Sequence, residues 1–534
     1  MWQQIYSPLG GSLGWSAAAA ALPVAVALIS LGVLHLPAWK SSLLGVLSAA
    51  VVAFAAYNMP GALLLNAAGY GAAFGLFPIG WIVYAAILLY NIAIDTGKFE
   101  IIKDSIGGVT GDERMQMLLI AFAFGAFLEG SCGFGTPVAV AAAMLAGLGM
   151  APLRASSVCL LANTAPVAFG AIAIPLVTLA GITGLPIESL SANVGRIVAP
   201  VSLILPAYLV VVMNGWASLG EVLPAVAVSG VAFAGTQFVI SNFVGASLTD
   251  ILSSLAAMLS LIALLRLWKP RGCAERVRHP HSARDLWSAW MPYVLLVVFV
   301  LLWGFDGVKH VLELATVKFA WPGLHNKILR TAPAVASASP YGAVYTLNWL
   351  SAAGTACLFA AIAGAMFLGV KPRRLAQLSW STARQLLLPM VTMAAVLALA
   401  FLMNYSGATA TLGLAFAATG KMFPFFSALL GWLGVFLTGS DTSSNALFGS
   451  LQVVTAAKLH LTPALMAAAN SSGGVMGKMI SLQSIAVAAA ATGMAAREET
   501  SLFRFTLKHS VLLAGVTGLI ATFYAYLQPG WVRW

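Results

Sequence analysis

Charged residues are scarce in this sequence: only 8% of its 534 residues are Asp, Glu, Lys or Arg, whereas 60% are hydrophobic. A soluble globular protein has about 25% charged residues, because its surface must meet water. A chain so poor in charge must place most of its outer surface against another medium, and lipid fits best. The composition therefore excludes an ordinary soluble domain and predicts an integral membrane protein.

Cysteine and histidine are also rare, with four and seven residues. Cys132, Cys159 and Cys357 lie in apolar stretches, and Cys273 lies in a basic loop. Their spacing matches no disulfide framework, metal site or redox pair. The glycine-rich run near residue 130 lacks the Gly-Lys-Ser/Thr ending of a phosphate loop. We therefore expect no bound metal and no cofactor, and the sequence argues against an enzyme.

Acidic residues are in deficit, with 16 against 27 basic residues and a formal charge of +11. Cytoplasmic loops of membrane proteins collect Lys and Arg, so this excess does not indicate nucleic-acid binding. Anionic lipid head groups would attract it. The basic stretches 269–289 and 371–384 are predicted to be cytoplasmic, and the loop 306–346 between them external.

Long hydrophobic runs, by contrast, are abundant. A helix that crosses the hydrocarbon core needs about 20 apolar residues. With shorter, interrupted runs near 131–150, 407–420 and 439–496, the sequence predicts an all-α polytopic membrane protein with about 12–14 transmembrane helices. The first run follows a neutral start, so we interpret it as a span and not as a signal peptide. The clear candidate spans are 15–36, 41–57, 75–94, 115–128, 155–180, 197–213, 219–240, 248–268, 290–305, 347–368, 386–403, 423–437 and 511–527.

Two parts of the chain resemble each other. Residues 127–131 (FLEGS) recur as 436–440 (FLTGS), and residues 162–165 (ANTA) recur as 469–472 (ANSS), at nearly the same spacing. An apolar run is also bracketed twice by proline and asparagine, at Pro78 and Asn91 and again at Pro389 and Asn404. Such self-similarity between halves is typical of transporters built from internal repeats.

Both copies contain residues that a regular membrane helix tolerates poorly. Glycines and a proline interrupt residues 125–137, and the polar run 438–445 (TGSDTSSN) interrupts the second copy. Unsatisfied backbone groups survive in a membrane only where they line a cavity. We therefore predict two inverted repeats whose re-entrant or broken helices meet at a midplane site. Kinked helices that pack through small residues are the alternative.

These features divide the chain into four parts. They are N-terminal transmembrane helices (1–58), a first transport repeat (59–214), connecting helices (215–370), and a second transport repeat with a C-terminal helix (371–534). The connecting helices include the basic loop 269–289 and the external loop 306–346.

Four motifs resemble the L-lactate permease family. They are residues 129–139 (EGSCGFGTPVA), 161–170 (LANTAPVAFG), 2–6 (WQQIY) and 473–481 (GGVMGKMIS), so the resemblance runs nearly end to end. It implies a symporter of the bacterial inner (plasma) membrane that imports L-lactate, glycolate or D-lactate together with a proton. The substrate is implied by this resemblance and not by composition or spacing.

The coupling ion is left open by a weaker resemblance. Residues 163–164 (NT) and 470–471 (NS) are similar to the paired hairpin-tip motifs of sodium–dicarboxylate symporters. A sodium-coupled carboxylate symporter is therefore an alternative. An anion channel is a second alternative, because polar loops also select ions. Asymmetric charges within a duplicated frame favour a carrier that occludes its substrate.

Charged residues within the spans are the first candidates for the site, because each costs about 2.5–3.5 kcal/mol at the bilayer centre. Lys478 is predicted to bind the substrate carboxylate, which needs a cation or hydrogen-bond donors in a low-dielectric site. An ion pair with Asp441 is the alternative role. Glu129 or Asp441 would carry the proton, and we favour Glu129 because its surroundings are more apolar. Asp95, at a span end, is expected to be an interfacial cap.

Polar residues around the breaks complete the predicted substrate site. Each of them could instead bond its own backbone or a neighbouring helix. Helix N-termini at the breaks could supply further donors to an anion. The candidates are Ser131, Thr136, Asn163, Thr164, Ser440, Ser443, Asn470, Ser471 and Gln483.

Overall fold

The computed structural model describes residues 1–133, 135–270, 281–335, 337–494 and 496–532. Within these ranges, 11 helical segments are long and apolar enough to cross a membrane, or 12 if one pair bent by 65° counts as a single span. The predicted class, an all-helical polytopic membrane protein, is confirmed. The count of 11 lies below the expected 12–14, and the count of 12 reaches its lower limit. Two further apolar helices, Pro137–Gly147 and Ala353–Phe367, are shorter than a full crossing.

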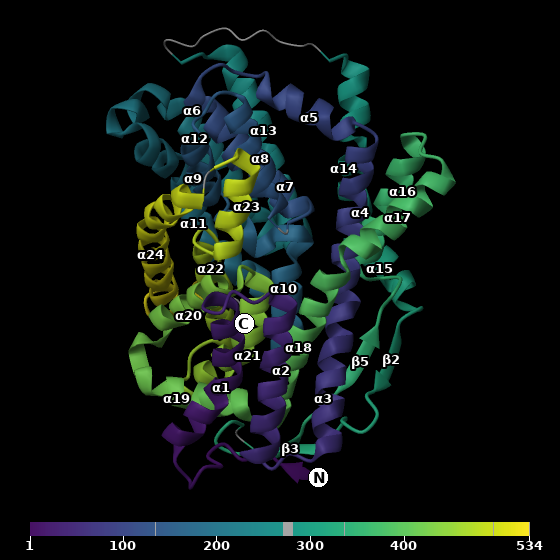
Figure 1. Cartoon of the computed structure of the whole chain (residues 1–534), viewed down its shortest axis with the longest axis vertical. Helices are drawn as coiled ribbons and strands as arrows, with labels where there is room; N and C mark the ends of the chain where they lie inside the picture. The colour runs from purple at the N-terminus through teal and green to yellow at the C-terminus, as the bar shows by residue number, and fades with distance from the viewer. Residues whose placement is uncertain (134, 271–280, 336, 495, 533–534) are drawn as a thin grey trace.

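In chain order, the helices form two sets on either side of a middle pair, and helices of the two sets lie side by side in the molecule (Figure 1). The first half contains α1 (Leu13–Gly32), α2 (Ala38–Ala55), α3 (Gly61–Phe74), α4 (Trp81–Asp95), α5 (Lys98–Gly107), α6 (Glu113–Gln116), α7 (Gly125–Ser131), α8 (Thr136–Gly147), α9 (Pro152–Ala162), α10 (Gly170–Thr183) and α11 (Ile187–Asn214). The middle pair is α12 (Trp216–Phe243) and α13 (Thr249–Leu267). The second half contains α14 (Ala283–Gly304), α15 (Asp306–Glu313), α16 (Ala353–Phe367), α17 (Pro372–Gln385), α18 (Leu387–Ser406), α19 (Ala408–Phe416), α20 (Phe423–Thr438), α21 (Asp441–Lys458), α22 (Pro463–Lys478), α23 (Leu482–Thr492) and α24 (Ala496–Tyr526).

Short helical segments of other types join some of these helices. The π-helical segments are η1 (Gly75–Gly80) and η2 (Met117–Phe124), and the 3-10 segments are η3 (Val167–Phe169), η4 (Ala246–Leu248), η5 (Ala417–Met422) and η6 (Pro529–Trp531). Proline and glycine set many helix boundaries. Helices α9, α17, α20 and α22 carry Pro in their first turn, where its missing N–H is not needed.

The predicted external loop 306–346 contains strands that the sequence analysis did not anticipate. Strand β2 (Val317–Ala320) pairs antiparallel with β5 (Val344–Leu347). Strand β3 (Ile328–Arg330) pairs parallel with β1 (Trp2–Gln3) and antiparallel with β4 (Ser339–Pro340). Strands of two to four residues are too short to show the alternating pattern that marks a strand in a sequence. The pairing of β1 with β3 places the N-terminal residues against this loop.

The two halves share an order of elements and a pattern of contacts. The series α7, break, α8, α9, break, α10, α11 corresponds to α20, break, α21, α22, break, α23, α24. Helix α8 packs against α23, and α10 packs against α21; likewise α9 packs against α24, and α11 against α22. Each contact is thus matched by the contact between the corresponding helices, as expected for two related repeats.

The same matching extends to helices outside the predicted repeat boundaries. Helices α1 and α2 pack against α19 and α18, and helices α14 and α16 pack against α5 and α4. The chain before α1 meets α19, where Thr411 donates a hydrogen bond to the Tyr6 carbonyl, and the chain before α14 meets α5, where His281 pairs with Asp104. Because α5 and α19 lie at opposite ends of the molecule (Figure 1), α1 and α14 run in opposite directions. An inverted repeat produces this arrangement.

Helices α20 and α22 touch through their backbones. A Cβ atom on Gly431 would lie 1.8 Å from the Asn470 carbonyl oxygen, and one on Gly473 would lie 2.0 Å from that of Ala428. A Cβ on Gly477 would lie 2.3 Å from the carbonyl oxygen of Trp432. Small residues allow this close approach in membrane proteins, where van der Waals packing replaces the hydrophobic effect between helices.

Candidate functional site

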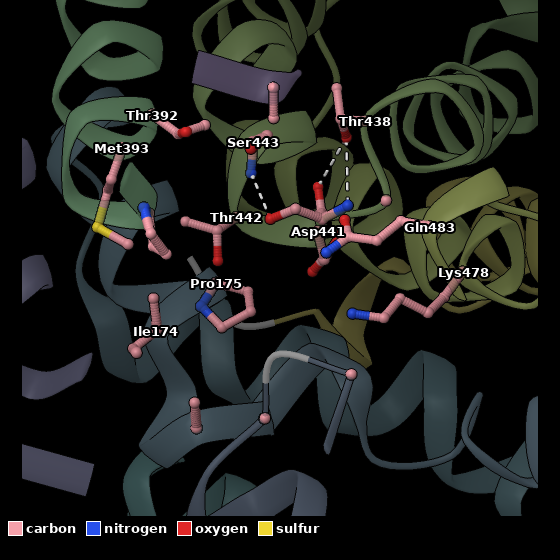
Figure 2. A pocket seen from close by; sticks show the side chains of 18 of the residues that line it. Ile174, Pro175, Thr392, Met393, Thr438, Asp441, Thr442, Ser443, Lys478 and Gln483 are labelled. Carbon is pink, nitrogen blue, oxygen red and sulfur yellow. Dashed lines mark hydrogen bonds between the residues drawn. The ribbon is translucent and has the colours of Figure 1, made fainter. Parts of the chain in front are cut away.

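A cavity of about 410 Å³ lies where the four breaks meet. Its lining includes Glu129 and the glycines after α7, the start of α10, residues 438–443 between α20 and α21, and Lys478 with Gln483 at the join of α22 and α23. Helix α18 and the start of α2 form the rest of the wall. Figure 2 shows Asp441 and Lys478 facing Ile174 and Pro175 across this space.

Two glycines create the breaks that open the cavity. Gly439 ends α20 with φ 72°, and Gly135 precedes α8 with φ 82°. This left-handed conformation costs little only for glycine, because other residues have a Cβ that clashes. Both breaks were predicted from these glycines and their polar neighbours.

The start of α10 is strained. Residues 171–173 (AIA) have φ of 45°, 59° and 62°, although none is glycine. Each such residue costs about 1–2 kcal/mol in this conformation. Strained backbone of this kind clusters at functional sites. The turn brings the backbone of Gly170 so near Glu129 that a Cβ there would lie 2.8 Å from Glu129 Oε1.

Glu129 is buried, with 3% of its surface exposed, and it lines the cavity. Its Oε2 accepts a hydrogen bond of 3.0 Å from Asn163 Nδ2. Asn163 does not itself line the cavity, and its side chain bonds the Glu129 carboxylate. The structure therefore brings together two residues that were predicted separately, and it gives Asn163 a supporting place.

Asp441 also lines the cavity and is 2% exposed. Its Oδ2 accepts hydrogen bonds from Ser471 Oγ (2.6 Å) and Asn445 Nδ2 (3.3 Å). Asn445 accepts in turn from Asn470, and Asn470 accepts from Gln452, so a buried polar network supports the acid. Within the described ranges, Asp441 Oδ1 has no hydrogen-bond partner, and it lies beside Gly474 of α22, where an added Cβ would be 2.3 Å from it.

Lys478 is the last residue of α22, and its side chain extends into the cavity (Figure 2). It is 9% exposed. It attracts both Glu129 and Asp441 electrostatically. A cation is also favourable at this position, because the C-terminal end of a helix carries partial negative charge. Among the described residues that line the cavity, Lys478 is the only cation.

Helix N-termini add hydrogen-bond donors around the cavity. Helix α21 begins at Asp441, with Ser440 Oγ accepting from the Ser443 amide, and α23 begins beside Gln483, with Ser481 Oγ accepting from the Ser484 amide. Such ends carry partial positive charge and attract anions. Together with Lys478, they surround the cavity with groups that attract anions.

The remaining predicted residues are distributed unevenly. Ser131 donates to the Phe127 carbonyl (2.8 Å) and Thr164 to the Leu161 carbonyl (2.7 Å), so both bond their own helices and neither lines the cavity. The side chain of Thr136 lies outside the described part. Asp95 pairs with Arg374 at the start of α17. The predicted residues that do line the cavity are Glu129, Ser440, Asp441, Ser443, Lys478 and Gln483.

Several site residues were missed in the sequence. Trp39, Thr392 and Met393 line the wall formed by α2 and α18. Asp250, on α13, is buried close to Glu129. A signal for Asp250 was present, because it is an acidic residue inside the apolar run 248–268. The wall residues gave none, since they come from ordinary apolar spans.

Replacing Ser471 by alanine is expected to destabilise the protein by about 1.5–3 kcal/mol, because a hydrogen bond to a buried carboxylate is lost. The neighbouring Ser472 is equally buried, but its hydroxyl has no partner in the described ranges. Ser472→Ala should therefore change stability by less than about 0.5 kcal/mol. Thermal unfolding of both purified variants in detergent makes the comparison. Equal melting temperatures would show that the Ser471 bond contributes nothing.

Broken helices that enclose a polar, charged cavity within a polytopic bundle define the class of secondary membrane transporters. The sequence profile of L-lactate permease matches residues 16–528, and the chain belongs to this family. The chain is 44% identical to the glycolate permease GlcA of Escherichia coli (strain K12), with 99% of each chain covered. It is 43% identical to the L-lactate permease of Bacillus subtilis (strain 168), with 100% of this chain and 99% of that protein covered.

Solved structures are more distant. The YdaH transporter of Alcanivorax borkumensis is 15% identical, with a TM-score of 0.45 over 87% of this chain and 88% of that chain. So distant a likeness says nothing about the cavity described above.

Proposed function

We propose that this protein is a bacterial inner-membrane symporter that imports L-lactate, and related 2-hydroxy-monocarboxylates such as glycolate or D-lactate, together with a proton. The observation that carries the proposal is the position of Lys478 in a cavity between the buried acids Glu129 and Asp441. The names of the relatives, an L-lactate permease and a glycolate permease, support this substrate class.

The lining suits each part of such a substrate. Lys478 and the start of α21 would bind the carboxylate, because charge-assisted hydrogen bonds are the strong ones. Gln483 and Ser443 would bind the 2-hydroxyl group. Ile174 and Pro175 form an apolar wall that would accept the methyl group of lactate and leave a gap beside glycolate. This division explains why both acids could bind.

Protonation of a buried carboxyl group in the cavity would couple proton movement to substrate binding. A substrate anion that enters beside an ionised carboxylate is repelled, so binding a proton to that carboxylate favours binding of the substrate. Glu129 is our choice for this residue, because the polar side chain that bonds it is the neutral Asn163. Asp441 receives two hydrogen bonds that stabilise its ionised form.

Sodium coupling is the second candidate, and the surroundings of Asp441 favour it. The Asp441 carboxylate, whose Oδ1 is unbonded in the described ranges, lies beside the hydroxyl of Ser471 and the amide of Asn445, and hard cations prefer oxygen ligands of these kinds. In that case Asp441 would bind the coupling ion, and Glu129 would have a structural role.

The deciding experiment uses purified protein in proteoliposomes and radiolabelled L-lactate, with proton and sodium gradients imposed separately. Accumulation driven by a proton gradient alone would support the proposal. Accumulation that requires sodium would move the coupling site to Asp441. Uptake that does not saturate with lactate concentration and never exceeds equilibrium would indicate a channel. The absence of uptake of any 2-hydroxy acid would reject the substrate class.

Replacing Glu129 by glutamine is expected to lower proton-driven accumulation of L-lactate at least about 10-fold, because the amide cannot bind and release the proton. Exchange of internal for external lactate at equal pH should persist at a reduced rate, since it needs no net proton movement. Glu313→Gln, at the exposed end of α15, is the control. Unchanged accumulation in Glu129→Gln would leave Asp441 as the coupling acid.

A further inference from the structure

Asp250 is a buried acid that the proposed mechanism does not use. It lies in the first turn of α13 and is 1% exposed. Neither of its carboxyl oxygens has a hydrogen-bond partner in the described ranges. Buried polar groups in folded proteins are almost always bonded, so an acid with two unbonded oxygens requires an explanation.

The neighbourhood of Asp250 points to Glu129. Helix α13 packs against α7 so closely that a Cβ on Gly130 would lie 2.7 Å from the Cβ of Asp250. Glu129 precedes this glycine, and the two carboxyl groups interact electrostatically. A glycine at position 130 therefore allows the second acid to approach the first.

No cation offsets the charge of Asp250 from the elements packed against it. Helices α7, α10 and α12 and the segments η2 and η4 contain no Lys, Arg or His. Their titratable groups are Glu129 and, at the start of α12, Glu221, which pairs with Arg114. The buried thiol of Cys132 follows α7 and interacts with Glu129.

An ionised Asp250 would thus be a buried charge without a described partner, beside another acid. The cost of such a charge is several kcal/mol even after relaxation. Two neighbouring carboxyl groups also resist being ionised together. In the conformation described, Asp250 must therefore be protonated.

We propose that Asp250 is a second proton-binding residue of the transport cycle, coupled to Glu129 across the contact between α7 and α13. The proposal rests on the proton symport argued above. In the cycle the O–H bond of Asp250 breaks and an O–H bond forms on Glu129, so the negative charge moves from Glu129 to Asp250. The first turn of α13 can then stabilise that charge, because the N-terminal end of a helix carries partial positive charge.

The test compares Asp250→Asn with the wild type in proteoliposomes. The asparagine keeps the shape of the protonated acid and cannot release a proton. We expect proton-driven accumulation of radiolabelled L-lactate to fall at least about 10-fold. Lactate exchange at equal internal and external pH should continue within about 5-fold of the wild type, and it should lose part of its dependence on pH.

Controls separate this inference from folding and from the proposed function. Asp285→Asn changes a partly exposed acid in the first turn of α14, away from the cavity, and should behave as the wild type. Accumulation and a pH profile equal to the wild type in Asp250→Asn would overturn the role of Asp250. Loss of exchange in a variant that elutes as a single folded species would also overturn it, since the residue would then be needed for binding. A wild type that ignores the proton gradient would instead reject the proposed symport.

Should Asp250→Asn not fold, Gly130→Ala supplies a second measurement. Its Cβ would collide with Asp250 Cβ, so the two helices must move apart by a small distance while both acids are kept. The proposal expects accumulation to fall more than exchange in this variant as well. An equal fall in both would overturn it.

Discussion

Replacing Lys478 by methionine is expected to lower L-lactate uptake about 100-fold or more, because removing one partner of a buried charge pair costs about 3–5 kcal/mol. Methionine keeps most of the length and apolar character of the lysine stem, so the change is mainly one of charge. Initial uptake rates in proteoliposomes measure the effect on transport. Stabilisation against heat by added L-lactate measures binding, and this ligand-induced shift should disappear.

Lys458→Met is a matched control, because Lys458 is the last residue of α21 as Lys478 is of α22, but it is exposed. It should transport within about 2-fold of the wild type. The double variant Lys478→Met with Asp441→Asn tests the alternative role, in which Lys478 only neutralises acids. Restored transport in the double variant would reject substrate binding by Lys478, whereas restored folding without transport would support it.

Replacing Gly473 or Gly431 by alanine is expected to cost about 3 kcal/mol or more, because overpacking in a rigid contact displaces backbone. The added Cβ would lie 2.0 Å from the Ala428 carbonyl oxygen in one case and 1.8 Å from that of Asn470 in the other. A carbonyl in a helix cannot turn aside as a flexible side chain can. Either variant should show a large loss of monodisperse protein on fluorescence-detected gel filtration and a lower melting temperature.

Gly515→Ala and Gly235→Ala are the controls for this prediction. Both glycines lie inside helices, and a Cβ at either position meets no atom within 4 Å. Alanine favours helix over glycine by about 0.5–1 kcal/mol, so these variants should be as stable as the wild type or slightly more stable. If Gly473→Ala had the same melting temperature and yield as Gly515→Ala, the result would contradict the close contact between α20 and α22.

The sequence predicted the membrane class and the breaks because both depend on residue type. Lipid excludes charge, so the composition reports the surrounding medium directly. Gly135 and Gly439 mark the breaks because only glycine adopts their conformation cheaply. Lys478, Glu129 and Asp441 could be picked out because a charge inside a span is costly and needs a reason.

Other features depend on tertiary packing and left weaker signals. The left-handed turn at residues 171–173 consists of Ala and Ile, which normally avoid that conformation. The supporting roles of Asn163 and Ser471 emerge only when separate helices are placed together. Likewise, α1 and α2 correspond to α14 and α16 by their contacts and not by shared residues. The sequence similarity therefore did not reveal this correspondence.

The backbone contact between α20 and α22 has an electrical consequence. Lys478 is the last residue of α22, and Asp441 follows α20 directly after the break. Because α20 and α22 are in close backbone contact at their glycines, we expect them to move together, with one positive and one negative charge. Moving a single charge through 100 mV takes about 2.3 kcal/mol, but an ionised pair that moves together takes none. This pair therefore adds no voltage dependence to the return of the empty carrier.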